Sequence, residues 1–188
     1  MDTGGSRTAL AGLPEPLRRV VVLALYTGQR RGDLCALRWS AYDGQAIRLV
    51  QQKTKEPLVI PCHPALKAEL DAWRQDTVAG IGEATLLTDN RGQPWKPNLL
   101  SHYLPAALVR IGMSNDINVH GLRKLAAANL AEAGCSTKEI AAITGHRTLA
   151  MVDLYTRSAD QKKLAGAAIV RFTDWSGETV KDITKSGG

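Results

Sequence analysis

The chain has 188 residues, 44% of them hydrophobic, which is enough for one globular domain with a sizeable core. Its 24 lysines and arginines exceed its 18 acidic residues, giving a formal net charge of +6 that permits a polyanionic partner such as nucleic acid. Three distant cysteines (35, 62 and 135) and a longest apolar run of only residues 20–25 argue against disulfides, a zinc site and a membrane span, so we expect a cytoplasmic protein without a membrane partner.

Helices are predicted at the start of the chain. Residues 1–13 are small and glycine-rich and are interpreted as a flexible lead-in. Prolines at positions 14 and 16 suit a first helical turn. They precede an apolar stripe at helical spacing, formed by Leu17, Val20, Val21, Ala24 and Leu25. Gly28 is predicted to end this helix, and a short helix is predicted over residues 31–37.

A β-hairpin is predicted next. Residues 46–50 alternate in character around Arg48, and residues 58–60 form a short apolar stretch. A tight connection over residues 53–56 joins the two segments. The apolar spacing of the following segment predicts an amphipathic helix over residues 64–73. A loop is expected over residues 76–83.

Shorter elements are predicted in the middle of the chain. Residues 85–87 are interpreted as a short strand and residues 89–92 as a turn. Residues 98–111 predict a helix, although Pro105 within it should introduce a kink.

A helix that begins near His120 is predicted to pack against the core. Its apolar stripe, which should be buried, consists of Leu122, Leu125, Ala126, Leu130 and Ala133. Gly134 is predicted to end this helix. Thr137 is then expected to cap a short helix that ends at Gly145.

The last part of the chain is predicted to contain two separate helical stretches. Tyr155 is expected near the end of the first, and Ser158 should cap the second, which continues to Val170. Residues 171–188 are interpreted as a polar C-terminal tail.

Four polar residues of this region combine anion-binding chemistry with helical spacing. His120 and Arg123 are three residues apart, so on a helix they share a face and could hold one anion from two sides. His146 follows the next helix, and Tyr155 lies nine residues further on. Each residue alone is more simply explained as a surface or packing side chain. Their combination is much rarer, so it must be weighed jointly.

The segments HGLR and TGH, with the tyrosine downstream, resemble the second half of the motif of tyrosine recombinases, the phage integrase family. TGQRRGDLCAL resembles the T-G-x-R-x-x-E segment of the first half, which places the first catalytic arginine at Arg30. The supporting carboxylate is then Asp33, where Asp replaces the commoner Glu but could still orient Arg30. QQKTKEPLVIP resembles the family hairpin with its K-T motif, which assigns the catalytic lysine to Lys53, with Lys55 as its competitor.

The resemblance covers residues 14–170 and implies a tyrosine recombinase catalytic domain. The implied fold is α+β, mainly α, with a small antiparallel β-sheet. The implied catalytic residues are Arg30, Lys53, His120, Arg123, His146 and Tyr155. We therefore expect site-specific DNA recombination, in integration or excision, through a covalent 3′-phosphotyrosyl intermediate at Tyr155.

The chemistry expected of these residues follows from the resemblance and from the charge of a phosphodiester. The two arginines would clamp the negative charge that gathers on its oxygens. Tyr155 would attack phosphorus with His120 as base, because a phenol is largely protonated at neutral pH. Lys53 would protonate the leaving 5′-oxygen, and His146 would donate a hydrogen bond to the phosphate.

The implied partners are double-stranded DNA and other protomers of the same protein assembled on it. No cofactor and no metal are expected, because no carboxylates are spaced to hold Mg²⁺ and a phosphotyrosyl link conserves the bond energy. The helical domain that precedes the catalytic domain in the family is not recognised here, so we expect an isolated catalytic domain or a shortened relative. Two alternatives stay open: a type IB topoisomerase-like DNA-relaxing enzyme, and a non-catalytic DNA-binding module of the same fold.

Overall fold

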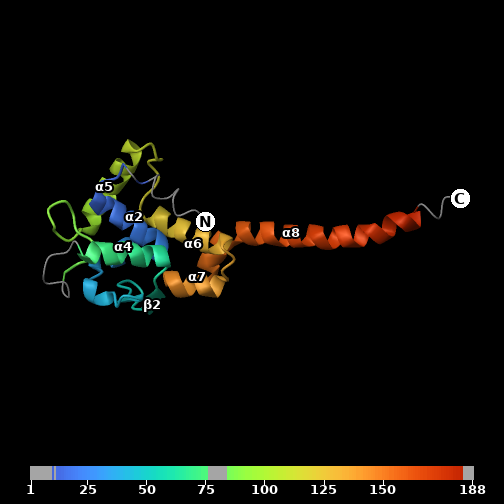
Figure 1. Cartoon of the computed structure of the whole chain (residues 1–188), viewed down its shortest axis with the longest axis horizontal. Helices are drawn as coiled ribbons and strands as arrows, with labels where there is room; N and C mark the ends of the chain where they lie inside the picture. The colour runs from blue at the N-terminus through green and yellow to red at the C-terminus, as the bar shows by residue number, and fades with distance from the viewer. Residues whose placement is uncertain (1–9, 11, 76–83, 184–188) are drawn as a thin grey trace.

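The computed structural model describes residue 10 and residues 12–75 and 84–183, so the predicted loop over residues 76–83 lies outside the described part. The described chain is mainly helical, with a two-stranded antiparallel sheet (Figure 1). This confirms the predicted fold class. The elements in chain order are α2 (Glu15–Thr27), α3 (Arg31–Ala36), η1 (Trp39–Ala41), β1 (Ala46–Val50), β2 (Pro57–Pro61), α4 (Pro64–Gln75), α5 (Pro97–Arg110), α6 (Val119–Glu132), α7 (Thr137–Thr144) and α8 (Leu149–Ile183).

Helix α2 lies in the centre of the core. All five residues from 20 to 24 are buried, because α3, α4 and α6 pack around this helix. The helix ends at Gly28 in the left-handed conformation, as predicted. Leu10 and Leu13 are buried in the same core, so the prediction of a flexible lead-in is wrong for these two apolar residues.

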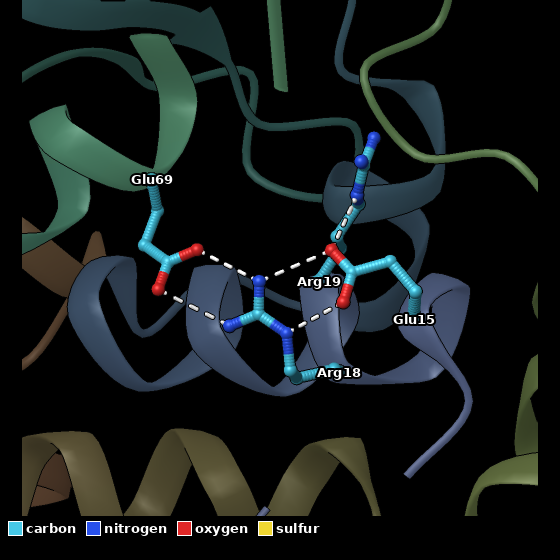
Figure 2. Close-up of polar contacts among 4 residues, drawn as sticks. All are labelled: Glu15, Arg18, Arg19 and Glu69. Carbon is cyan, nitrogen blue, oxygen red and sulfur yellow. Dashed lines mark hydrogen bonds and ion pairs between the residues drawn. The ribbon is translucent and has the colours of Figure 1, made fainter. Parts of the chain in front are cut away.

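Arg18 ties α2 to α4 through an ion pair, and Arg19 contacts α4 through an aromatic ring (Figure 2 shows the ion pairs). The Nε atom of Arg18 lies 2.7 Å from Oε2 of Glu15, and its Nη2 atom lies 2.8 Å from Oε2 of Glu69. Arg19 pairs with the same Glu15 at 2.9 Å, and its guanidinium lies 5.2 Å from the centre of the Trp73 ring. Forked guanidinium pairs of this kind restrict the relative orientation of the two helices.

The predicted β-hairpin is confirmed, with β1 and β2 paired antiparallel. Ile47 pairs with Ile60, and both side chains are buried against the core, whereas Val59 on the opposite face is exposed. The strand predicted over residues 85–87 is wrong. Thr85 forms only an isolated bridge to Arg38, flanked by two backbone hydrogen bonds, from Trp39 to Ala84 and from Leu86 to Leu37. The pairing goes no further because the partner segment turns into the short helix η1 directly after Arg38.

Helix α6 buries part of the predicted stripe: Leu122 and Ala126 are buried as predicted, and Leu130 is half-buried. Leu125 is 48% exposed and Ala133 is also exposed, so the prediction that both are buried is wrong. Arg123, Ala127 and Ala131 are buried instead. The reason is that α7 and α8 pack against this alanine-rich side of α6, where small side chains allow close approach.

The start of α7 is capped by Ser136, so the prediction of Thr137 as N-cap is wrong. The Ser136 hydroxyl accepts from the backbone N–H of Glu139, whose carboxylate accepts from the Ser136 backbone. This reciprocal capping box satisfies two backbone donors, which a cap at the next residue could not arrange with the same glutamate. Gly145 ends α7 in the left-handed conformation.

Helix α8 is one continuous helix, so the prediction of two stretches with a cap at Ser158 is wrong. It also includes residues 171–183 of the predicted tail. The segment lacks proline and is rich in alanine and long side chains that favour helix, so nothing interrupts it. Only the first turns pack against α6 and α7, with Val152 fully buried. Every side chain from 164 to 173 is exposed, and Figure 1 shows the helix leading away from the other elements.

No helix in the described part of the chain combines the length and apolar character needed to cross a bilayer.

Candidate active site

Arg123 is the most deeply held of the predicted site residues. It lies on the buried face of α6 and is only 4% exposed. Its Nη1 atom donates to the carbonyl oxygen of Gly28 at 2.6 Å and to that of Thr144 at 2.7 Å. These carbonyls are the last groups of α2 and α7, so Arg123 joins the ends of two helices. Its Nη2 atom is buried and has no hydrogen-bond partner among the described residues.

Burial and the charge of Arg30 together lower the pKa of Arg123 to about 10, although Tyr155 and Asp33 act in the opposite direction. A pKa of about 10 still leaves the guanidinium protonated at neutral pH. The site therefore contains a fixed positive charge with a buried donor, Nη2, that could serve an anionic ligand.

Arg30 stands at the start of α3 and is half-buried. Its Nη1 atom donates to Oε1 of Gln51 at 2.6 Å. Asp33, predicted to orient Arg30, is instead bonded through Oδ1 to the backbone N–H of Gln52 at 2.8 Å. Asp33 and Arg30 therefore do not pair with each other. The residues after β1 offer each of them another partner: the Gln51 carboxamide for Arg30 and the Gln52 backbone N–H for Asp33. Oδ2 of Asp33 is buried without a partner among the described residues.

His146 follows α7 and is half-buried. Its Nδ1 atom lies 2.6 Å from the hydroxyl of Thr144, which donates its own hydrogen to the carbonyl of Ile140. Because a hydroxyl has one hydrogen, Nδ1 must be the donor of this pair, and Nε2 of a neutral His146 is an acceptor. Burial and the nearby charges of Arg123 and Arg30 lower the pKa of His146 to about 4.

His120 and Tyr155 lie on the same side of the molecule as His146. His120 is exposed in the first turn of α6, and partial desolvation together with Lys124 and Arg123 lowers its pKa. The ring of Tyr155 is centred 6.2 Å from that of His146. Tyr155 packs on a small apolar cluster of α6, α7 and α8, formed by Ala127, Ala131, Ile140 and Val152. Of the three apolar residues just before Tyr155, Val152 is buried in this cluster and docks the segment, whereas Met151 and Leu154 are exposed.

Lys53 is not brought to this group. It is exposed in the turn between β1 and β2 and makes no hydrogen bond or ion pair with any residue that the structure describes. The same holds for the side chain of Lys55, whose backbone φ is 59°. The structure therefore gathers five predicted residues, Arg30, His120, Arg123, His146 and Tyr155, and leaves the lysine at the end of a hairpin.

Three further residues of the site are not among the predicted ones. Gln29, Gln51 and Thr144 are each at most 1% exposed and are hydrogen-bonded to one another through their side chains or carbonyls. The two glutamines stand in short polar stretches that read as loops, so periodicity holds no sign of their burial. Elsewhere in the described ranges, no three His, Cys, Asp or Glu side chains are grouped as a possible metal site.

Residues 8–162 match the phage integrase family. The chain is 33% identical over 153 residues to the integrase of Escherichia phage HK022, covering 78% of this chain and 42% of that protein. It is 32% identical to tyrosine recombinase XerC of Mycobacterium sp. (strain KMS), covering 79% of this chain and 52% of the relative. It thus spans about half the length of these relatives. A crystal structure of a lambda integrase dimer bound to a COC′ core site superposes with a TM-score of 0.65 and 29% identity, covering 80% of this chain and 55% of that one.

Proposed function

The chain belongs to the phage integrase family, and on that premise we propose that it cuts and rejoins double-stranded DNA in site-specific recombination. One observation carries the proposal most directly. Arg123 is a buried cation whose Nη1 is held by two carbonyls while its buried Nη2 lacks a partner among the described residues. Such an arrangement suits a phosphodiester oxygen, because a positioned guanidinium stabilises charge as it develops.

The proposed step is attack of the Tyr155 oxygen on a DNA phosphorus. The phenolic proton passes to His120, the bond from phosphorus to the 5′-oxygen breaks, and Lys53 protonates that leaving oxygen. The product is a 3′-phosphotyrosyl bond and a free 5′-hydroxyl. A 5′-hydroxyl from another strand reverses the step, so joining needs no external energy source.

His146 has a conditional part in this proposal. Its Nδ1 donates to Thr144, so Nε2 can donate to a phosphate oxygen only when the ring is an imidazolium. The pKa of His146 is low in the free protein because of burial and two arginines. An approaching phosphate supplies negative charge, which favours protonation of the ring. His146 would then add its donor only after DNA is bound.

Other protomers on the same DNA are part of the proposal. The lambda integrase structure is a dimer on a core site. In this chain the part of α8 beyond its packed first turns carries exposed apolar side chains, Leu164, Ile169, Val170 and Phe172. A second copy of this chain is the proposed partner of these side chains. A cytoplasmic location is also proposed, supported by three cysteines that are all unpaired.

The test is covalent trapping. The chain is incubated with a pool of nicked duplexes whose base pairs around the nick are randomised, and the products are separated by denaturing electrophoresis. A protein–DNA adduct that persists in excess chelator supports the proposal. Binding without an adduct would leave a DNA-binding module, and relaxation of supercoiled DNA without rejoining between duplexes would favour the topoisomerase-like alternative.

A further inference from the structure

Gln51 is a fully buried glutamine that directly follows β1, with 0% exposure. Its carboxamide makes all four hydrogen bonds that such a group allows. Nε2 donates to Oε1 of Gln29 at 2.8 Å and to the carbonyl of Thr144 at 2.9 Å. Oε1 accepts from Nη1 of Arg30 at 2.6 Å and from the hydroxyl of Thr54 at 2.8 Å. Strand, turn, α3 and α7 therefore meet at one side chain.

The backbone of Gln51 also closes the turn that carries Lys53. Its N–H donates to the carbonyl of Glu56 at 2.9 Å, and its carbonyl accepts from the N–H of Lys55 at 2.8 Å. Thr54, the next residue after Lys53, is bonded to the Gln51 side chain. The start and the middle of this turn are thus fixed to the same residue, although the Lys53 side chain itself is exposed.

The Nε2 atom of Gln51 connects the turn to Arg123 and His146 through Thr144. The carbonyl of Thr144 accepts from both Gln51 and Arg123, and the hydroxyl of Thr144 bonds to the ring of His146. The contact is close, because a Cβ added at Gly145 would overlap the Gln51 carboxamide. Four residues of the candidate active site are therefore linked through one buried amide, directly or through one neighbour.

We propose that Gln51 is a positioning residue that holds Arg30, the Lys53 turn and the Arg123–His146 pair in register for phosphoryl transfer. The inference rests on the proposed function and deepens it. Glutamine suits this place because it is neutral and offers two donors and two acceptors. Glutamate would set a carboxylate oxygen against the two acceptor oxygens of Gln29 and Thr144, and leucine would leave every partner without its bond.

Two substitutions distinguish the bond between Gln51 and the turn from the other bonds of the Gln51 side chain. Thr54→Val removes only the hydrogen bond from the Thr54 hydroxyl to the Gln51 carboxamide, with little change in side-chain shape, and leaves the backbone bonds of the turn in place. Gln51→Leu removes all four bonds and so disturbs Arg30 as well as the turn. Gln45→Leu is the matched control, because Gln45 is exposed just before the other end of β1 and makes no side-chain hydrogen bond with the described residues.

The test is single-turnover cleavage of nicked duplexes that carry either an ordinary 5′-oxygen or a bridging 5′-sulfur, which needs no proton on leaving. Each variant is assayed at a temperature below its own thermal unfolding midpoint. Thr54→Val should be about 10-fold slower on the oxygen duplex and close to wild type on the sulfur duplex. Gln51→Leu should be about 100-fold slower on oxygen, with only partial recovery on sulfur because Arg30 is also displaced.

Wild-type rates for Gln51→Leu, or equal slowing on both duplexes, would overturn the positioning role. A general loss of structure lowers both rates by one factor and leaves their ratio unchanged. If the wild-type protein itself forms no adduct, the proposed function fails instead. The network is then judged without DNA, by hydrogen exchange of the Gln51 carboxamide in NMR spectra: slow exchange supports the buried network, and exchange at the rate of Gln45 contradicts it.

Discussion

The candidate active site has two parts that the fold holds in different ways. Arg123 and Gln51 are buried and bonded to carbonyls or carboxamides of several elements. The side chains of Lys53 and Tyr155 instead make no hydrogen bond with the described residues: Lys53 is exposed on a turn whose backbone Gln51 holds, and Tyr155 packs on the small apolar cluster around Val152. The groups proposed to stabilise charge are thus fixed by hydrogen bonds, whereas the side chains proposed to transfer a proton or form a bond are not.

This difference has a clear consequence for mutagenesis. A change in the buried part should alter both the stability of the fold and the chemistry, because the same hydrogen bonds serve both. A change in the exposed part should alter the chemistry alone. The predictions below test that division, beginning with the largest effect.

Arg123→Ala should reduce single-turnover cleavage by roughly 1000-fold, because a positioned guanidinium is lost from the developing charge. It should also lower the free energy of unfolding by about 2 kcal/mol, since the carbonyls of Gly28 and Thr144 each lose a hydrogen bond. Denaturant unfolding measures the second effect. Arg110→Ala, an exposed residue at the end of α5, should leave stability unchanged. If Arg123→Ala is as stable as wild type, the hydrogen bonds of Arg123 do not serve both stability and catalysis, and the proposed division is wrong.

Lys53→Ala should slow cleavage of an ordinary duplex by about 100-fold and leave the unfolding midpoint unchanged, because this side chain is exposed. A duplex with a bridging 5′-sulfur should restore most of the rate. Lys55→Ala, two residues further along the same turn, is the control. If Lys55→Ala shows the rescue and Lys53→Ala does not, the assignment of the proton donor is wrong.

Acidification should destabilise the protein through His146. The pKa of this ring is about 4 in the folded chain, below its ordinary 6.5, because of burial and the charges of Arg123 and Arg30. The unfolded chain therefore binds more protons between these two values, and stability falls as pH is lowered through that window. From pH 7 to 5 we expect the unfolding midpoint to fall by about 3 °C, after allowance for partial exposure. His146→Gln should flatten this dependence, and an unchanged slope would contradict the assignment.

Arg18→Ala should have the smallest effect on stability and no effect on cleavage, because Arg18 lies outside both parts of the site. Its ion pairs with Glu15 and Glu69 join α2 to α4, and their loss should lower the free energy of unfolding by about 1 kcal/mol. Cleavage at saturating DNA should be unchanged, because none of these residues belongs to the site. A large loss of cleavage with intact folding would show that the α2–α4 contact also positions catalytic groups.

The local parts of the fold could be predicted from the sequence. Helix α2 and the hairpin follow from apolar spacing and from Gly28, which act within a few residues. The buried face of α6 could be predicted only in part, since its alanines allow several orientations and the choice depends on α7 and α8. The continuity of α8 was also missed, because Ser158 has the chemistry of a cap but lies in a stretch without proline that is rich in helix-forming residues.

The candidate site shows the same limit. Arg30 and Arg123 stand out through their motifs, but the carbonyls that hold Arg123 belong to Gly28 and Thr144, distant in sequence. The burial of Gln51 likewise depends on contacts with Gln29, Arg30 and Thr144, which are distant from it in sequence. Such long-range hydrogen bonds leave no periodic pattern, so they emerge only once the elements are placed.

The central claim is that Tyr155 carries the covalent bond to DNA. Of the other tyrosines, Tyr42 is buried and bonded to Asp71, Tyr26 stacks on His63, and Tyr103 is 53% exposed beside Trp95. Tyr103 is therefore the best control.

The most direct measurement is mass-spectrometric peptide mapping of the adduct trapped on a nicked duplex, for wild type, Tyr155→Phe and Tyr103→Phe. We predict that wild type and Tyr103→Phe carry DNA on the peptide containing Tyr155, whereas Tyr155→Phe binds DNA and forms no adduct. An adduct mapped to any other residue, or one that persists in Tyr155→Phe, would contradict the mechanism.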